Sequence, residues 1–208
     1  MNVYIVGTAI RYAALVDDSV RVERIEDADV VIFTGGDDVS PALYGCAPHP
    51  KTVCELPRDT EELHAFREIR PHQLALGICR GAQLLCVLCG GLLVQHCENH
   101  FIKDGTHEMT DGAARYPITS THHQMMYPFR LPPSEWKMLF WAENRTGGAA
   151  EGEGIDPAVL AARGEPEIVV FHRRGLPPCL CVQGHPERMP GTPTAALVNR
   201  LIRQYLPK

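Results

Sequence analysis

The stretch Leu74-Ala-Leu-Gly-Ile-Cys-Arg-Gly-Ala-Gln83 decides the fold of this chain. Its apolar beginning, Leu74–Ile78, predicts a buried strand. The mostly apolar residues 81–89 predict a helix that ends at Gly90-Gly91. The order strand, tight turn and helix is the repeating unit of a protein in which helices cover a parallel sheet.

The turn inside this stretch is a thiol version of the G-x-S-x-G turn, with Cys79 between Gly77 and Gly81. Glycines on both sides allow a sharp turn that lifts Cys79 to the start of the following helix. The positive end of the helix dipole favours a thiolate there, and the amide of Arg80 can face a developing oxyanion. A buried core cysteine beside helix-packing glycines is the alternative for such a motif taken alone.

The rest of the chain alternates between strand and helix patterns. In residues 57–70 the apolar residues Leu63, Phe66 and Ile69 share one helical face. Residues 142–166 are rich in Gly, Ala and acidic residues, which predicts a surface loop with a short helix rather than a linker. We therefore expect one α/β domain over residues 1–208, with a mostly parallel central sheet and helices on both faces. The further strands are expected at Asn2–Val6, 29–33, 116–120, 138–142, 168–172 and 180–183, and the further helices at 57–70 and 194–205.

Composition excludes several classes of function. The 208 residues are 45% hydrophobic, and 20 Lys and Arg against 25 Asp and Glu give a net charge of −5. This charge gives no reason to bind nucleic acid or an anionic membrane, and it disfavours a polyanionic substrate such as a polyglutamate tail. No apolar run is long enough to span a membrane. Without an export signal, the 8 cysteines indicate reduced thiols and a cytoplasmic protein.

A second segment, Leu180-Cys-Val-Gln-Gly-His-Pro-Glu187, is an apolar strand that ends in a histidine and a glutamate. Pro186 restricts His185 to an extended backbone. Residues two apart in an extended chain point to the same side, so Glu187 can hold the imidazole of His185 in one tautomer. A base that activates a thiol needs this arrangement.

A third segment, Val31-Ile-Phe-Thr-Gly-Gly-Asp-Asp-Val-Ser-Pro41, places two glycines after a buried strand. The backbone amides of Gly35 and Gly36 can approach a ligand closely and complete an oxyanion hole. Taken alone, Gly-Gly followed by Asp is also ordinary turn chemistry.

These segments together resemble the class I glutamine amidotransferase superfamily over most of the chain. The resemblance is to its gamma-glutamyl-gamma-aminobutyrate hydrolase and gamma-glutamyl peptidase branch, in a compact form that would suit a bacteriophage genome. The motifs that carry it are TGGDDVSPALYG (34–45), the Arg58-Asp59 helix start, LGICRGAQLL (76–85), GGLLVQ (90–95), STHHQ (120–124) and VQGHPE (182–187).

The resemblance implies a flavodoxin-like fold and a cysteine hydrolase of gamma-glutamyl amides that acts through a thioester. The substrate would be a small gamma-glutamyl compound, glutamine included, and no metal, nucleotide or other cofactor is expected. The other reading is a glutaminase subunit that delivers ammonia to a synthetase partner. The residues implied are the triad Cys79, His185 and Glu187, the oxyanion-binding amides of Gly36 and Arg80, and the substrate-binding Gly35, Gln83, Ser120, Thr121 and His122.

Two further readings stay open from the residues alone. Cys86-x-x-Cys89, followed by His96, Cys97 and His100, offers zinc ligands, although core burial explains the two helix cysteines more simply. The protein could also be a binding module with a redox-sensitive Cys79, which an intact triad argues against. We expect residues 99–115 to form a brief connection that places His107 on a loop, either at the pocket or on the surface.

Overall fold

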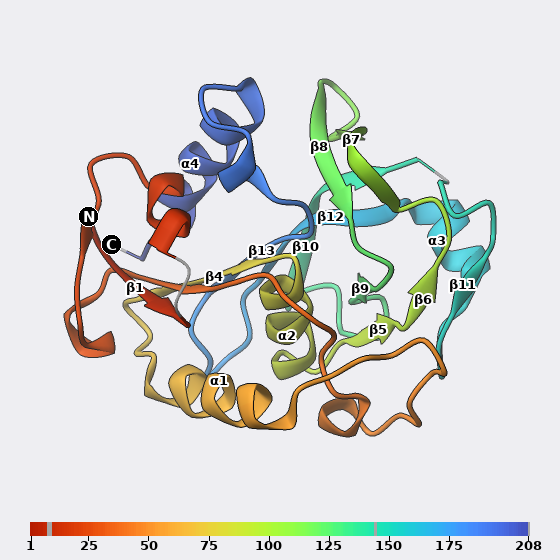
Figure 1. Ribbon diagram of the computed structural model, residues 1–208, viewed down its shortest axis with the longest axis horizontal. Helices are drawn as coiled ribbons and strands as arrows, with labels where there is room; N and C mark the ends of the chain where they lie inside the picture. The colour runs from red at the N-terminus through yellow and green to blue at the C-terminus, as the bar shows by residue number, and fades with distance from the viewer. Residues whose placement is uncertain (8–9, 144, 208) are drawn as a thin grey trace.

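The computed structural model describes residues 1–7, 10–143 and 145–207 of the chain. Its centre is a nine-stranded sheet (Figure 1). In spatial order the strands are β2 (Val20–Arg21), β1 (Asn2–Val6), β3 (Val30–Phe33), β4 (Leu74–Ile78), β13 (Cys179–Val182), β12 (Glu165–Phe171), β10 (Trp136–Ala142), β7 (Phe101–Thr110) and β8 (Arg115–Thr121).

The sheet is parallel in one half and antiparallel in the other. Strands β2, β1, β3, β4 and β13 run parallel, and from β13 onward each neighbour runs antiparallel. The connections explain the change, because β7 and β8 are joined by a short hairpin and parallel neighbours need a long crossover. The expected α/β class is confirmed, and the sheet is mixed.

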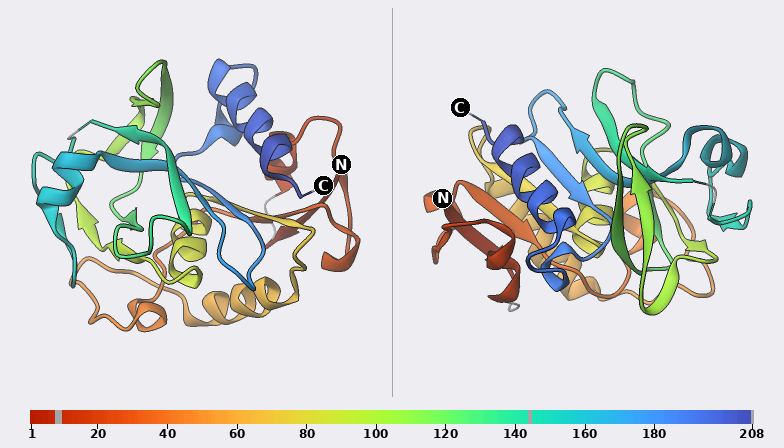
Figure 2. Two further views of the ribbon diagram at one scale, coloured as in Figure 1. Left: turned by 180° about the vertical axis from the view of Figure 1, so that it is seen from behind. Right: turned by 90° about the horizontal axis from the view of Figure 1, so that it is seen from above.

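Helices cover both faces of the sheet, as expected. Helices α1 (Leu56–Glu68) and α2 (Arg80–Leu88) lie on one face, while α4 (Pro193–Tyr205) covers the other (Figures 1 and 2). Phe66 of α1 packs with α2 in one apolar core, and Ile202 of α4 packs in the second. The remaining elements are α3 (Pro157–Arg163), the small strand pairs β5 (Leu92–Val94) with β9 (Met125–Tyr127) and β6 (His96–Cys97) with β11 (Ala150–Glu151), and the 3₁₀ turns Ile10–Leu15, Ile25–Asp27, Pro41–Tyr44 and Pro186–Arg188.

One expectation about this fold is wrong. Residues 99–115 are not a brief connection, because they contain the ten-residue strand β7. Pairing with β8 keeps this polar segment extended, although its own alternation of apolar side chains is weak.

All eight cysteines are free thiols, and five of them besides Cys79 are buried. None of the described helices has the length and apolar character that crossing a membrane requires.

Candidate active site

The three motif segments meet because they follow three neighbouring strands. β4 lies between β3 and β13, with Gly77 opposite Phe33 and Ile78 opposite Val182. All three strands are parallel, so their carboxyl ends lie at one edge of the sheet, where open α/β proteins bind ligands. The glycine loop after β3, the cysteine after β4 and the histidine after β13 therefore face one another.

Cys79 occupies a strained turn between β4 and α2. Its backbone is left-handed, with φ 53° and ψ −111°, an uncommon conformation for a residue with a side chain. Both flanking glycines are required by close packing. A Cβ on Gly77 would lie 2.5 Å from the Gly81 oxygen, and a Cβ on Gly81 would overlap the Phe33 carbonyl. This geometry is the tight strand-to-helix turn that the spacing predicts.

His185 is held from two sides. Its Nδ1 lies 2.7 Å from Oε1 of Glu187, and its backbone amide donates to Oγ1 of Thr119 at 2.6 Å. Burial alone would lower the pKa of His185, but hydrogen bonds with Cys79 and Glu187 outweigh it and raise the pKa to about 9. The imidazole is thus oriented by Glu187 and can exchange a proton with the thiol.

The oxyanion position expected between Gly36 and Arg80 lies next to a buried ionic network. The Arg80 side chain, 1% exposed, forms ion pairs with Asp59 and Glu62 of α1. The nearby Arg58 donates to the carbonyl oxygens of Thr34 and Gly35 at 3.2 and 3.0 Å.

Arg58 also lies 3.1 Å from Glu62, so this network joins the glycine loop to the elbow. A side chain at Gly36 would overlap the guanidinium of Arg58. The sequence marks Arg58 and Asp59 only as a helix start, and nothing local in it indicates that these charges turn inward.

A pocket of about 390 Å³ opens over Cys79. Its local charge is opposite in sign to that of the chain, because three basic side chains line it and none of its described lining residues is acidic. Sequence reasoning missed this basic wall, whose members are far apart in the chain. The lining residues are Arg11, Tyr12, Gly35, Gly36, Cys79, Phe101, Lys103, Thr121, His185 and Arg188.

The residues expected to bind substrate divide into two groups. Gly35 and Thr121 line the pocket. Gln83, Ser120 and His122 are buried beside it and bind the protein's own backbone. Gln83 Nε2 donates to the Gln124 oxygen at 3.0 Å, and Ser120 Oγ donates to the His100 oxygen at 2.6 Å.

The zinc set that the sequence leaves open as an alternative, two helix cysteines with nearby histidines, is not assembled among the described residues. Cys86 and Cys89 lie in the apolar core, where Cys89 Sγ is 3.7 Å from Cys179 Sγ. Burial also raises the pKa of the Cys86 thiol. His107 lies on β7 rather than on a loop, is 4% exposed, and pairs with Glu167 at 2.6 Å.

Comparison with protein-family models agrees with this geometry, because residues 4–130 match the model described as Peptidase C26. The chain belongs to the peptidase C26 family. The matched residues carry the glycine loop and the cysteine elbow, and they end before the segment with His185 and Glu187.

Individual proteins are also similar to this chain in sequence. The chain is 46% identical over 69 residues, 32% of its length, to a glutamine amidotransferase-like protein of Lactococcus lactis subsp. cremoris, of which 37% is covered. It is also 34% identical to protein NtpR of Enterococcus hirae over 109 residues. This match covers 51% of the present chain and 44% of NtpR. These matches span less than half of either relative.

The fold has solved counterparts. A glutamine amidotransferase from Thermotoga maritima superposes with a TM-score of 0.56 over 99% of this chain and 94% of that one, at 15% identity. This likeness shows the shared α/β architecture. The family model and the homologues together relate this chain to peptidase C26 and glutamine amidotransferase-like proteins.

Proposed function

We propose that this protein hydrolyses the amide bond of a small gamma-glutamyl compound through a thioester on Cys79. The observation that carries the proposal is the alignment of Cys79, His185 and Glu187 at one edge of the sheet, with a 2.7 Å contact between the last two. This arrangement supplies a nucleophile, a base and a group that orients the base.

In the first half-reaction the Cys79 thiol passes its proton to His185, and the sulfur attacks the side-chain carbonyl carbon of the glutamyl group. The amides of Gly36 and Arg80 stabilise the resulting oxyanion. As the carbon–nitrogen bond breaks, His185 gives its proton to the leaving amine, and the glutamyl thioester remains. In the second half-reaction His185 takes a proton from water, the hydroxide attacks the thioester, and glutamate and the Cys79 thiol are released.

The pocket supports a substrate that carries a carboxylate. Lys103 and Arg188 line it together with Arg11, so cationic groups surround the space above Cys79. A glutamyl head presents an α-carboxylate, for which such side chains are suitable partners. The net charge of −5 alone disfavours a polyanionic substrate, but the substrate meets the local positive charge of the pocket. An additional carboxylate on the leaving group is therefore also compatible with the site.

The test is a substrate panel with the purified chain. It contains glutamine, gamma-glutamyl derivatives of a neutral and of a carboxylate-bearing amine, the α-glutamyl isomers and simple amides. We expect turnover of the gamma-glutamyl compounds only, and mass spectrometry of acid-quenched enzyme should find a glutamyl adduct on the peptide that contains Cys79. Equal turnover of simple amides would exclude the glutamyl pocket.

The second candidate is a glutaminase subunit that delivers ammonia to a synthetase. The same panel, run with and without a candidate synthetase, distinguishes this subunit from a free-standing hydrolase. Such a subunit would hydrolyse glutamine slowly alone and faster with a synthetase encoded beside it. Independent turnover that no candidate partner accelerates would favour the free-standing hydrolase.

A further inference from the structure

A group of buried histidines and glutamates lies beside the catalytic residues and takes no part in the proposed reaction. This histidine cluster consists of His100, His107, His122, Glu165 and Glu167, each at most 5% exposed. His107 lies on β7, both glutamates lie on β12, and the other two histidines flank the β7–β8 hairpin. The ring of His100 lies 4.8 Å from that of His122 and 5.1 Å from that of His107.

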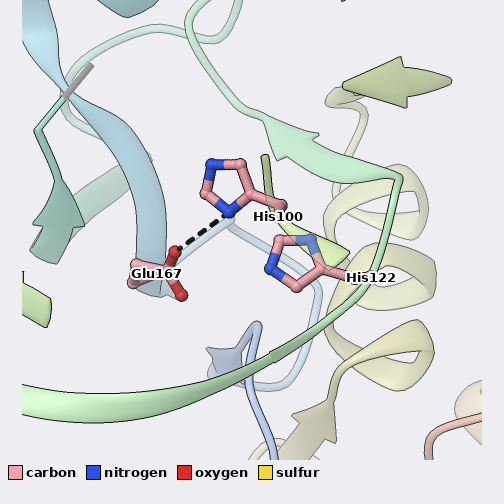
Figure 3. A group of neighbouring side chains, drawn as sticks. All are labelled: His100, His122 and Glu167. Carbon is pink, nitrogen blue, oxygen red and sulfur yellow. Dashed lines mark ion pairs between the residues drawn. The ribbon is translucent and has the colours of Figure 1, made fainter. Parts of the chain in front are cut away.

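Three members of the cluster point ligand atoms toward one position. One ligand atom each from His100, His122 and Glu167 lies within 4.8 Å of the other two. Figure 3 shows both imidazoles turned toward the Glu167 carboxylate. His100 Nδ1, His122 Nε2 and Glu167 Oε2 are buried and have no hydrogen-bond partner among the described residues. Buried polar atoms seldom remain unpaired in this way.

The outer contacts settle where the proton of His122 lies. Its Nδ1 is 2.9 Å from the carbonyl oxygen of Gln124, which can only accept, so Nδ1 carries the hydrogen. An imidazole with its hydrogen on Nδ1 presents the lone pair of Nε2, and this Nε2 is buried without a partner among the described residues.

His100 is oriented in the same manner. Its Nε2 lies 2.9 Å from Glu165 Oε2, and Glu165 also accepts from the Thr146 amide and hydroxyl at 2.9 and 2.7 Å. Glu165 is the acceptor in these contacts, so Nε2 of His100 is the donor. Nδ1 of His100 lies 3.8 Å from Oε1 of Glu167, too far for a hydrogen bond.

The same Glu167 oxygen, Oε1, lies 2.6 Å from His107 Nε2, which leaves Oε2 without a partner among the described residues. The Glu167 carboxylate therefore lies beside the unpaired Nε2 of His122 and the unpaired Nδ1 of His100. Acceptor atoms that face one another without a donor repel, and a cation removes the repulsion.

We propose that His100 Nδ1, His122 Nε2 and Glu167 Oε2 bind a divalent transition-metal ion, with zinc as the best fit. Two imidazoles and one carboxylate are a ligand set that zinc uses, and a ligating histidine typically donates its other ring nitrogen to a carboxylate or a backbone carbonyl. Glu165 and the Gln124 carbonyl are such outer partners. Tetrahedral bonds of about 2.0–2.1 Å require ligand atoms roughly 3.3 Å apart, so the ion draws the three side chains together.

A fourth position is available to water. The backbone amide of Gln183 donates to the backbone carbonyl oxygen of Glu167 at 2.8 Å. The two residues are therefore opposite each other on neighbouring strands. Opposite side chains lie on the same face of a sheet. The buried side-chain amide of Gln183 also has no partner among the described residues, and it can hold a water on the ion.

The ion would be a structural one, since acyl transfer to a thiol does not require it. It would tie β12 to the end of β8, where Thr121 lines the pocket and Thr119 accepts from the His185 amide. This role is independent of which amide the enzyme cleaves.

The test is metal binding by the full chain after removal of bound metal with chelator. We expect one equivalent of Co²⁺ to give the intense visible absorption of tetrahedral coordination, and one equivalent of Zn²⁺ to displace it and raise Tm. Glu167→Gln keeps the shape of the side chain, and His122→Gln removes a different ligand. Each should weaken Co²⁺ binding at least about 100-fold.

The matched control is His49→Gln/His123→Gln, which removes two partly exposed histidines near the surface. It should bind Co²⁺ as the unchanged protein does. The proposal is wrong if the unchanged protein gives no tetrahedral spectrum at one equivalent. It is equally wrong if the signal survives both cluster variants and disappears in the control, because the ion is then adventitious on surface histidines. If a cluster variant fails to fold, the control variant still decides against the proposal when the signal disappears with His49 and His123.

Discussion

Gly35 and His185 are packed so closely that only a glycine fits between the loop after β3 and the imidazole. A Cβ on Gly35 would lie 2.6 Å from Cε1 of His185 and 3.0 Å from the hydroxyl of Tyr12. Tyr12 is in turn fixed by the Gly35 amide, which donates to its hydroxyl at 3.1 Å. The glycine loop therefore determines the position of the imidazole, and in the proposed reaction its Gly36 amide also faces the oxyanion.

We predict that Gly35→Ala lowers kcat by about 100-fold or more while the protein stays folded. The added methyl group must push the imidazole away from Cys79, and misplacing a catalytic group by about 1 Å costs about this much. Steady-state hydrolysis of a gamma-glutamyl amide measures the loss, and thermal unfolding checks the fold.

A double variant identifies the contact responsible. Tyr12→Phe removes the hydroxyl that is the second neighbour of the new methyl group. Gly35→Ala/Tyr12→Phe should remain as slow as Gly35→Ala if the clash with His185 is the cause. Recovery of the rate in the double variant would instead assign the effect to Tyr12.

Two cysteine variants separate chemistry from packing. Cys79→Ala should abolish hydrolysis of gamma-glutamyl amides and leave Tm nearly unchanged, because it removes only the sulfur from a turn at the pocket wall. Cys86→Ala should keep the activity and lose about 1 kcal/mol or more of stability, because its thiol is fully buried in the core. Activity in Cys79→Ala would end the thiol-enzyme interpretation.

The titration of His185 should report the Glu187 contact. The pKa of about 9 predicts that the His185 signal of ¹³C-histidine-labelled protein titrates near pH 9, well above the ordinary 6.5. Glu187→Gln removes one of the hydrogen bonds that raise the pKa, so the midpoint should fall. The rate of this variant should exceed that of His185→Ala by roughly 100-fold, because orientation of the base is lost but the base remains. An unchanged midpoint would contradict the pairing.

The same shift has a consequence for stability. The folded-state pKa of His185, about 9, lies above the unfolded value near 6.5. The stabilisation from this imidazolium is therefore complete below about pH 6.5 and is lost as the pH rises through about 9. The stability advantage of the unchanged protein over His185→Gln should shrink across that interval, as urea unfolding at a series of pH values can show.

The parts of the fold that the sequence predicts are those fixed by neighbouring residues. β4 spans Leu74–Ile78 as predicted, because a short apolar run directly before the Cys79 turn has few other conformations. The turn at Cys79 follows from the same local pattern, and its contact with His185 follows from the placement of both at strand ends.

The features that sequence reasoning missed depend on contacts between distant residues. β7 carries few apolar residues and becomes a strand by pairing with β8. His100 and Glu165 are 65 residues apart, and neither has a local signal for its partner. Asp59 and Glu62 lie in the first turns of the amphipathic helix α1, where their charge predicts exposure, yet both are buried. Charged side chains turn inward only where a partner is present, and here that partner is Arg80 of another helix.

The ionic network at Arg80 leads to the last prediction. Arg80→Met leaves the buried Asp59 without its ion pair and leaves Glu62 only its ion pair with Arg58, which costs about 3–5 kcal/mol of stability. The triple variant Arg80→Met/Asp59→Asn/Glu62→Gln removes the charges as well and should recover part of that loss. Arg24→Ala removes an exposed arginine that pairs with Asp27 and should leave Tm unchanged. Urea unfolding of the four proteins measures these differences, and an Arg80→Met protein as stable as Arg24→Ala would show that the network does not hold α1 against the elbow.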